Sequence, residues 1–219
     1  MRRLIISFVL FLFVTASPAQ QHSTGDFHGC PPNGDATATS PSDPDLNALK
    51  NRDVPPNSYI TKKITAIIND VPAASDAGKK RRDRWTTAQR NSVATKESTG
   101  IQVVGFLAGV KKEGPESCNC HDPNRVDYHM WIVPGAGQKR SQSVVVEISP
   151  RLLEAHPGWP NLAKQAKTNG TLVRIRGWRT WDQEHPEQLG KTRATLWEIH
   201  PIHEIDVQNS GGNWVPIDQ

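Results

Sequence analysis

The chain has 219 residues, of which 36% are hydrophobic and 22% are charged, with 26 Lys and Arg against 22 Asp and Glu. This length suffices for one domain of ordinary size plus additional segments. The formal charge of +4 includes Arg2 and Arg3 near the N-terminus, and without them the 24 remaining basic residues exceed the 22 acidic ones by two. A balance this close to neutral argues against a dedicated nucleic-acid-binding domain, which is usually much more basic.

Residues 1–19 have the pattern of a secretory signal peptide. Two arginines precede an apolar run from Leu4 to Val14, and small residues surround Ala19. The apolar run is shorter than a bilayer span needs, and the remaining sequence contains no run of about 18 apolar residues. We therefore expect cleavage after Ala19, export to the periplasm or the extracellular medium, and no membrane span in the mature chain.

Residues 20–99 are predicted to form a largely irregular N-terminal arm. Its first part, residues 20–43, is rich in Ser, Thr, Pro, Gly and Asp and nearly free of large apolar residues. We expect a short helical turn within residues 43–52, a strand within residues 58–70, and a short helix after the basic run at residues 79–82. This basic run is either a solvated loop or part of a surface for a polyanion.

Alternation of period two, which is typical of strands, begins at Gly100 and continues to residue 114. Two glycines on one face of this segment predict the bent strand of a barrel corner. The next two strands are predicted at residues 127–134 and 141–150. A helix broken by prolines follows at residues 150–170, and two further strands follow at residues 171–181 and 194–207. Residues 209–219 remain as a C-terminal tail.

This order of elements over residues 100–208 resembles the OB-fold. The resemblance implies a mainly β protein, with a five-stranded Greek-key barrel and a helical connection between strands 3 and 4. The segments CNCHDPNRVDYHMWI, VVVEISPRL, RIRGW and ATLWEIHPI are also similar to a group of secreted bacterial proteins of uncharacterised function. That likeness implies a secreted bacterial protein and no particular activity.

The chain has three cysteines, and after export they would lie in an oxidising compartment, where thiols tend to form disulfides. A bridge between Cys118 and Cys120 would be strained, so we expect a disulfide from Cys30 to one of these two and a free thiol on the other. The alternative is a zinc site, with ligands from Cys30, Cys118, Cys120 and His121. The lack of a C-x-x-C pair favours the disulfide, and no other cofactor is expected.

The segment ATLWEIHPIHEIDV, residues 194–207, combines a strand pattern with clustered carboxylates and imidazoles. Alternate side chains of a strand face opposite sides, so Trp197 and Ile199 should pack inward. Glu198 and His200 then lie on the polar side of the sheet. The question is whether they meet polar groups from neighbouring strands.

His129 and Glu147 lie on the neighbouring predicted strands, so they could converge with Glu198 and His200 on one side of the barrel. Imidazoles and carboxylates together can bind a divalent metal ion or transfer protons near neutral pH. The simpler interpretation is the half-solvated face of an antiparallel sheet. No H-E-x-x-H spacing and no nucleophile elbow support catalysis.

The fourth predicted strand offers a binding surface. Arg174, Arg176 and Trp178 alternate with apolar residues, and arginines beside an exposed aromatic ring can hold phosphates and stack bases or sugars. Outward arginines also commonly keep a strand soluble. OB-like barrels bind oligonucleotides and oligosaccharides through one sheet face and the adjacent loops.

The favoured hypothesis is therefore an exported, non-enzymatic binding protein for an oligonucleotide, an oligosaccharide or another anionic molecule. One alternative is a metal-dependent hydrolase that uses the His and Glu residues of the barrel strands. The other is a purely structural secreted domain, in which all of these residues serve as framework.

Overall fold

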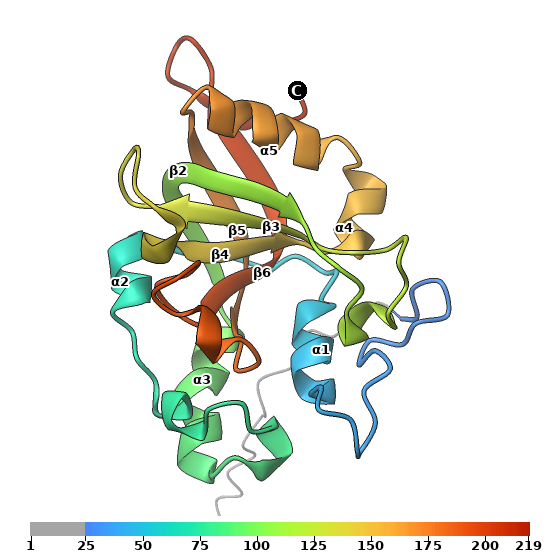
Figure 1. Cartoon of the computed structure of the whole chain (residues 1–219). Helices are drawn as coiled ribbons and strands as arrows, with labels where there is room; N and C mark the ends of the chain where they lie inside the picture. Colours follow the sequence, from blue (N-terminus) through green and yellow to red (C-terminus); the bar gives the residue numbers. More distant parts are fainter. Residues whose placement is uncertain (1–24) are drawn as a thin grey trace, which may run out of the picture.

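The structure is a computed structural model that describes residues 25–219. Five strands form a closed barrel at its centre (Figure 1). The barrel strands are β2 (Gly100–Lys112), β3 (Tyr128–Val133), β4 (Val144–Ile148), β5 (Leu172–Trp181) and β6 (Trp197–Gln208). Each corresponds to one of the predicted strands, so the mainly β fold class is confirmed. The predicted signal peptide at residues 1–19 lies outside the described residues.

The barrel strands pair in the order β2–β3–β4–β6–β5, and β5 pairs with β2 to close the barrel. Neighbouring strands are antiparallel except for β4 and β6, which are parallel. Two helices, α4 (Pro150–Ala155) and α5 (Trp159–Thr168), connect β4 to β5, and α5 packs against β2. This arrangement confirms the predicted OB-like barrel with a helical connection between its third and fourth strands.

The first barrel strand bends as it passes from one partner to the next. Residues 100–106 pair with β5, and residues 106–112 pair with β3 across a register shift between Leu107 and Gly109. A Cβ atom at Gly105 would lie 2.4 Å from Ile64 Cδ1, closer than side-chain carbons approach. Only glycine fits at this close contact. This agrees with the prediction that glycines allow the first barrel strand to bend.

The barrel encloses a core of branched apolar side chains. Val103, Ile132 and Ile175 come from three different strands, and none of them has any exposed surface. Complete burial of such a side chain stabilises the fold by about 1.5–3 kcal/mol. On β6, Trp197 and Ile199 are also fully buried in this core, which confirms the predicted inward face of that strand.

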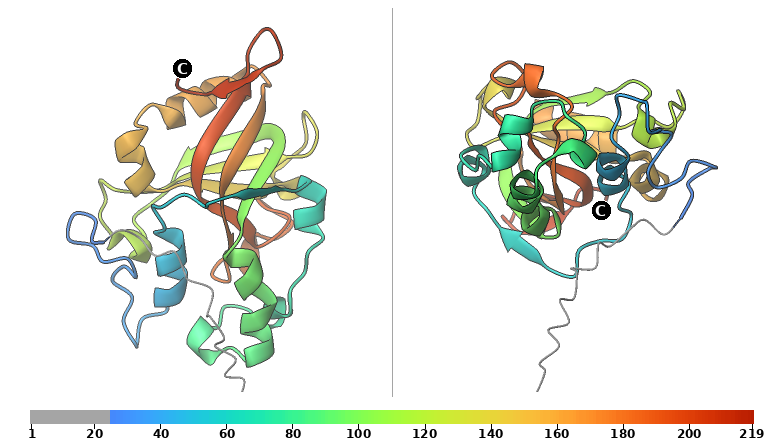
Figure 2. Two further views of the ribbon diagram at one scale, coloured as in Figure 1. Left: turned by 180° about the vertical axis from the view of Figure 1, so that it is seen from behind. Right: turned by 90° about the horizontal axis from the view of Figure 1, so that it is seen from below.

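The N-terminal arm is irregular between short elements, as predicted, but it packs closely against the barrel (Figure 2). Its elements are α1 (Pro44–Lys50), β1 (Tyr59–Thr61), α2 (Ile64–Ile68), the 3-10 helices η1 (Ala73–Ala77) and η2 (Arg82–Arg84), and α3 (Thr87–Glu97). Ile64, Trp85 and Val93 are at most 3% exposed and join the barrel core. The arm therefore supplies part of the hydrophobic core, which the sequence did not indicate.

The basic run at residues 79–82 is not a free cationic surface. Arg82 is 6% exposed, and its two terminal nitrogens each lie 2.7 Å from an oxygen of Glu97. The backbone N–H of Trp181 donates to the same carboxylate at 2.9 Å, which attaches α3 to the end of β5. Lys79 pairs with Glu187 at 2.8 Å. These contacts neutralise charges that a polyanion site would need.

The C-terminal residues continue the sheet instead of forming a free tail. β7 (Trp214–Pro216) pairs antiparallel with the end of β6. Ile217 is 8% exposed and packs in the core cluster. Figure 2 shows the β6–β7 hairpin projecting beyond one end of the barrel. The predicted boundary at residue 208 coincides with the end of β6, but the residues after it return to this strand.

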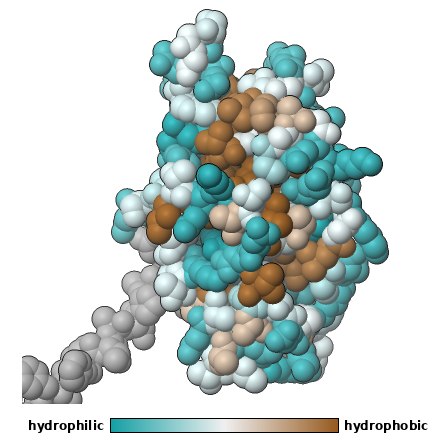
Figure 3. Space-filling view, turned by 90° about the vertical axis from the view of Figure 1, so that its left-hand side faces the viewer, coloured by the Kyte–Doolittle hydropathy of each residue, from teal (hydrophilic) through white to brown (hydrophobic). Residues whose placement is uncertain are grey.

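The surface carries few large apolar side chains. Within residues 25–219, the exposed ones are Ile60, Val71, Val104 and Leu189. Figure 3 shows hydrophobic groups interspersed with hydrophilic ones on one side of the molecule. Scattered apolar residues of this kind are normal on a protein surface. No helix in the described part of the chain combines the length and the apolar composition that a membrane span needs.

Candidate metal centre

The four polar residues predicted to converge do meet on one face of the barrel. His129 on β3 is directly opposite Glu147 on β4, and the parallel pairing of β4 with β6 places His200 on the other side of Glu147. His129 Nε2 is 2.9 Å from Glu147 Oε1, and His200 Nδ1 is 3.1 Å from Glu147 Oε2. Glu198 Oε2 lies 3.7 Å from His200 Nδ1. A row of imidazole, carboxylate and imidazole thus crosses three neighbouring strands.

This face is buried, which corrects the expectation of a half-solvated sheet. His129 is 7% exposed, Glu147 is 1% exposed, and Glu198 and His200 have no exposed surface. Helix α1 of the arm lies against β6, and Figure 1 shows it beside the lower part of the barrel. The strand pattern assigned the side chains to the correct faces, but it did not reveal the segment that covers one of these faces.

Arg193 connects this row to the loop between β5 and β6. The side chain is fully buried, and its Nη1 lies 2.6 Å from Glu198 Oε1 and 2.9 Å from Asp182 Oδ2. Asp182 follows the end of β5 and also pairs with His185 Nδ1 at 2.7 Å. One guanidinium therefore compensates two buried carboxylates, which would otherwise be costly to desolvate.

The loop between β2 and β3 supplies the other end of the cluster. Asp127 is 1% exposed, and its Oδ2 accepts hydrogen bonds from Asn119 Nδ2 at 3.1 Å and from Cys118 Sγ at 3.7 Å. Lys50 at the end of α1 is 2% exposed, and its Nζ is 3.5 Å from Glu116 Oε2. We call the whole set the polar cluster; its members are Lys50, Glu116, Cys118, Asp127, His129, Glu147, Asp182, His185, Arg193, Glu198 and His200.

Burial and mutual charge shift several pKa values in the polar cluster. Burial by itself lowers the pKa of an imidazole, but the neighbouring Glu147 outweighs it and raises the pKa of His129 to about 9 and that of His200 to about 10. Although burial opposes it, the same two imidazoles hold the pKa of Glu147 well below its usual range. Burial and the nearby charge of Glu116 raise the pKa of Asp127 to about 7.

We expect the stability of the metal-free chain to fall as the pH rises above neutrality. The pKa of His129 is about 9 and that of His200 about 10 in the folded chain, against 6.5 as the ordinary value. Their stabilising contribution is therefore complete below about pH 6.5 and is lost as the pH rises through 9 to 10. Each contributes up to about 1.4 kcal/mol per pH unit within this window. Urea unfolding across the window measures the slope.

The substitution His200→Asn should make this slope smaller. As a control, His121→Asn should leave the slope unchanged, because the His121 side chain is 59% exposed and lies outside the polar cluster. A free energy of unfolding that stays constant or increases over the same window would contradict the protonated imidazoles.

Several buried polar atoms of the cluster lack a hydrogen bond. Among the described residues, these atoms include both ring nitrogens of His200, Glu147 Oε2, Glu198 Oε2 and Asp127 Oδ1. The contact of 3.1 Å between His200 and Glu147 is thus an ion pair without hydrogen-bond geometry. An unsatisfied buried polar group costs about 1–3 kcal/mol, unless water or an ion satisfies it.

Two overlapping sets of side chains have the spacing of metal ligands. In Asp127, Glu147 and His200, one ligand atom from each residue lies within 4.8 Å of the others, and all three residues are buried. The second set, Glu116, Cys118 and Asp127, meets the same distance limit. Imidazole nitrogen, carboxylate oxygen and thiolate sulfur are all ligands of divalent transition metals. The residues present therefore fit a metal ion.

Trp178, which was predicted to be an exposed stacking platform, is buried. It is 4% exposed, and its Nε1 donates to the carbonyl of Val54 at 2.8 Å. β5 pairs with β2 in regular register from Leu172 to Trp178, so Trp178 lies on the same face of the strand as Arg174 and Arg176. The arm covers this end of the face, and Arg52 lies over the Trp178 ring at 4.6 Å. The ring packs under the arm and is not available for stacking on a base or a sugar.

The two arginines predicted to bind an anion already have acidic partners. Arg174 Nε is 2.7 Å from Asp206 Oδ2, and Arg176 pairs with Glu204. Both side chains are 20% exposed, so they lie at the surface of the sheet. An anionic ligand would have to compete with these carboxylates.

The cysteines form the predicted disulfide, and the structure identifies the partner. Cys30 bridges to Cys120, at a sequence separation of 90, and Cys118 stays free and 2% exposed. The alternative zinc set of Cys30, Cys118, Cys120 and His121 does not assemble, because the bridge consumes two of its thiols. His121 instead pairs with Asp35 at 2.7 Å.

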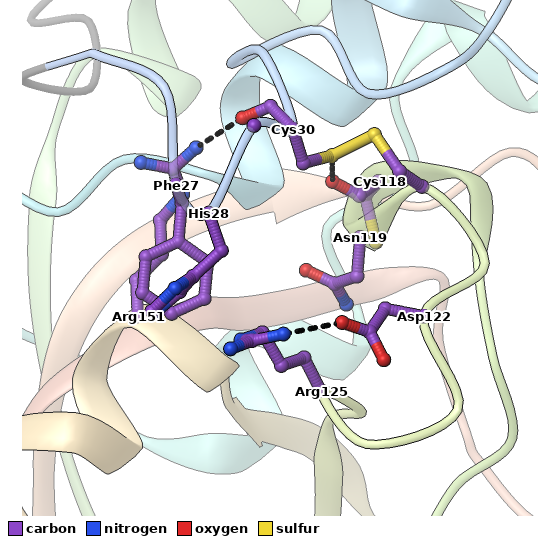
Figure 4. Close-up of a pocket in the computed structure, with 10 residues that line it drawn as sticks. Phe27, His28, Cys30, Cys118, Asn119, Asp122, Arg125 and Arg151 are labelled. Carbon is purple, nitrogen blue, oxygen red and sulfur yellow. Dashed lines mark hydrogen bonds and ion pairs between the residues drawn. A yellow bond between two sulfur atoms is a disulfide. The ribbon is translucent and has the colours of Figure 1, made fainter.

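A cavity of about 200 Å³ lies beside the disulfide (Figure 4). Phe27 and His28 of the arm line it, together with Arg125 and with Cys118 and Asn119 of the 3-10 helix η3 (Ser117–Asn119). Cys118 and Asn119 both donate to Asp127, so this wall joins the cavity to the polar cluster.

No sequence pattern singled out five members of the polar cluster, which are Lys50, Glu116, Asp182, His185 and Arg193. Lys50 belongs to the arm, while Asp182 and Arg193 bracket the polar loop between β5 and β6. Charges in such segments are usually solvated, so no local pattern distinguishes these from ordinary surface residues. The shared strand face of Asp127 and His129 was the one available signal for Asp127.

Neither the protein-family models nor the curated proteins match this chain. The likeness to a group of secreted bacterial proteins therefore remains an expectation. The geometry of the described residues is the basis for a functional proposal.

Proposed function

We propose that this chain is a non-enzymatic binding protein whose barrel face holds a divalent transition-metal ion, with Asp127, Glu147 and His200 as ligands. The supporting observation is the set of buried ligand atoms without hydrogen bonds: Asp127 Oδ1, Glu147 Oε2 and both ring nitrogens of His200. A cation would satisfy the two carboxylate oxygens and one of the two imidazole nitrogens. It would also offset the excess of carboxylates over the permanent cations Lys50 and Arg193 in the polar cluster.

The donor types indicate the class of ion. One imidazole and two carboxylates suit Zn²⁺, Mn²⁺, Fe²⁺ or Co²⁺, whereas Ca²⁺ prefers about six to eight oxygen ligands. His200 binds a metal only as the neutral imidazole, so binding releases the proton that Glu147 favours in the metal-free chain. Affinity should consequently increase as the pH rises.

The environment of this face favours a small cation over an anionic polymer. OB-like barrels bind ligands on the face of strands 2 and 3, which are β3 and β4 here. On that face Glu147 is buried between His129 and His200, and α1 lies against the neighbouring strand β6. Hydrolysis at a metal requires an open coordination position, and Asp127, Glu147 and His200 are each at most 1% exposed. Binding without catalysis is therefore the better-supported function.

We also infer that the protein works outside the cytoplasm. The Cys30–Cys120 disulfide is typical of exported proteins, because reducing agents keep cytoplasmic thiols free. The signal-peptide pattern at residues 1–19 supports the same location.

Addition of Zn²⁺ to the EDTA-treated chain is expected to raise its free energy of unfolding. A free ion concentration of about 100 times the dissociation constant stabilises the folded state by about 2.7 kcal/mol, because the unfolded chain lacks the assembled site. Thermal unfolding with Zn²⁺, Mn²⁺ and Co²⁺ in turn, combined with elemental analysis of the purified protein, measures both the shift and the bound ion.

The matched variants are Asp127→Asn and Asp76→Asn. The first removes a proposed ligand and should abolish the stabilisation, while the second changes an exposed carboxylate and should retain it. If none of the three ions binds to the unaltered chain, the proposal is wrong, and the polar cluster is a structural ion-pair network.

A further inference from the structure

The free cysteine lies between two carboxylates of the polar cluster. Cys118 Sγ is 3.7 Å from Glu116 Oε2 and 3.7 Å from Asp127 Oδ2, and the residue is 2% exposed. A buried free cysteine usually behaves as a small apolar side chain. Two adjacent carboxylates oppose a reactive thiolate, so a role as a nucleophile does not fit this setting. A cation beside the sulfur reverses this effect, since a coordinating thiol is deprotonated outright.

Asp127 belongs to both sets of metal-ligand spacing. One ligand atom each from Glu116, Cys118 and Asp127 lies within 4.8 Å of the others, and the same limit holds for Asp127 with Glu147 and His200. Asp127 Oδ2 faces the thiol, whereas Oδ1 is buried and has no hydrogen bond. A carboxylate with two oxygens can bridge two metal ions, as in two-metal sites.

We propose that the polar cluster holds a second divalent ion, of the zinc type, bound by Glu116, Cys118 and Asp127, with Asp127 bridging it to the first ion. This inference rests on the proposed function, because the bridge presupposes the first ion. The thiolate makes the second position selective for Zn²⁺, Co²⁺ and similar ions over Mg²⁺ and Ca²⁺, which prefer oxygen ligands.

Formation of this site is a balanced exchange. The S–H bond of Cys118 breaks, its proton leaves to the buffer, and a sulfur–metal bond forms without any change in oxidation state. Lys50 Nζ, 3.5 Å from Glu116 Oε2, supplies the positive charge beside Glu116 in the metal-free chain. The incoming ion takes over this role, and the ammonium group keeps its buried carboxylate neighbours as partners.

The cavity in Figure 4 adjoins this position. Cys118 and Asn119 form part of its wall, and the Arg125 and His28 side chains on its rim are 35% and 43% exposed. An ion that enters the cavity thus meets the residue whose sulfur is proposed to bind it. The first position, at Glu147 and His200, lies deeper in the cluster.

The test is the stoichiometry and the ligand type of bound metal in the EDTA-treated chain. Titration with Zn²⁺ should give two ions per chain, and Co²⁺ should produce a sulfur-to-metal charge-transfer band in the near ultraviolet. In Cys118→Ser, which keeps the Cys30–Cys120 bridge, the stoichiometry should fall to one and the band should disappear. The Asp76→Asn chain serves as the control and should match the unaltered protein.

The outcomes separate the two proposals. One ion per chain in both the unaltered protein and Cys118→Ser, with no thiolate band, would overturn the second position and retain the first. If the unaltered protein binds one ion and Cys118→Ser binds none, the chain has a single site with a thiolate ligand, and the proposed pair of ions bridged by Asp127 is wrong. If no ion binds at all, the proposed function fails together with this inference.

Discussion

The substitution Arg193→Met is expected to lower the free energy of unfolding by about 3–5 kcal/mol. The side chain has no exposed surface, and its guanidinium lies 2.9 Å from Asp182 and 2.6 Å from Glu198. Methionine fills a similar volume but removes the guanidinium that both buried carboxylates share. Because domains are stable by only about 5–15 kcal/mol, this loss is a large share of the total. Urea unfolding followed by tryptophan fluorescence measures it.

An exposed ion pair provides the matched control. Lys79 and Glu187 lie 2.8 Å apart, with side chains 60% and 50% exposed, so Lys79→Met should change stability by less than about 1 kcal/mol. Adding Glu198→Gln to Arg193→Met should recover part of the loss, because it removes one of the two carboxylate charges that shared the guanidinium. If Arg193→Met proves no more destabilising than Lys79→Met, Arg193 does not carry the charge balance of the cluster.

Removal of the disulfide is expected to have a comparable effect. The disulfide joins Cys30 and Cys120, which are separated by 90 positions in the sequence, and it therefore closes a long loop. Restricting the unfolded chain in this way stabilises the folded state by about 2–4 kcal/mol in typical proteins, with larger values for longer loops. Cys30→Ser with Cys120→Ser should therefore lower the urea midpoint substantially, and the midpoint of this variant should not change when reductant is added.

Cys118→Ser is the control for this second prediction. It leaves the bridge intact and replaces a free thiol, so in the absence of metal its stability should stay within about 1 kcal/mol of the unaltered protein, and thiol titration of the unfolded chain should find no free cysteine. A double variant as stable as the unaltered chain would show that burial alone holds the arm against the loop between β2 and β3.

Local periodicity was sufficient to predict the barrel strands, and their order along the chain carried the resemblance to the OB-fold. Alternation along β6 assigned Trp197 and Ile199 to one face and Glu198 and His200 to the other, and prolines delimited the helical connection after β4. These features depend on a residue and its near neighbours, which is why they can be read from the sequence. Alternation also assigned Trp178 to the face of Arg174 and Arg176, but it could not show that the arm buries the ring there.

The sequence by itself determined the order of the strands, the faces of their side chains, and the presence of a disulfide from Cys30. Only the tertiary structure decided that the polar face is buried, that Cys120 is the bridging partner, and that Lys50 and Arg193 join the polar cluster. The physical reason is that alternation fixes the direction of a side chain relative to its strand. Burial, charge compensation and metal-ligand spacing depend instead on segments that are distant along the chain and close in space.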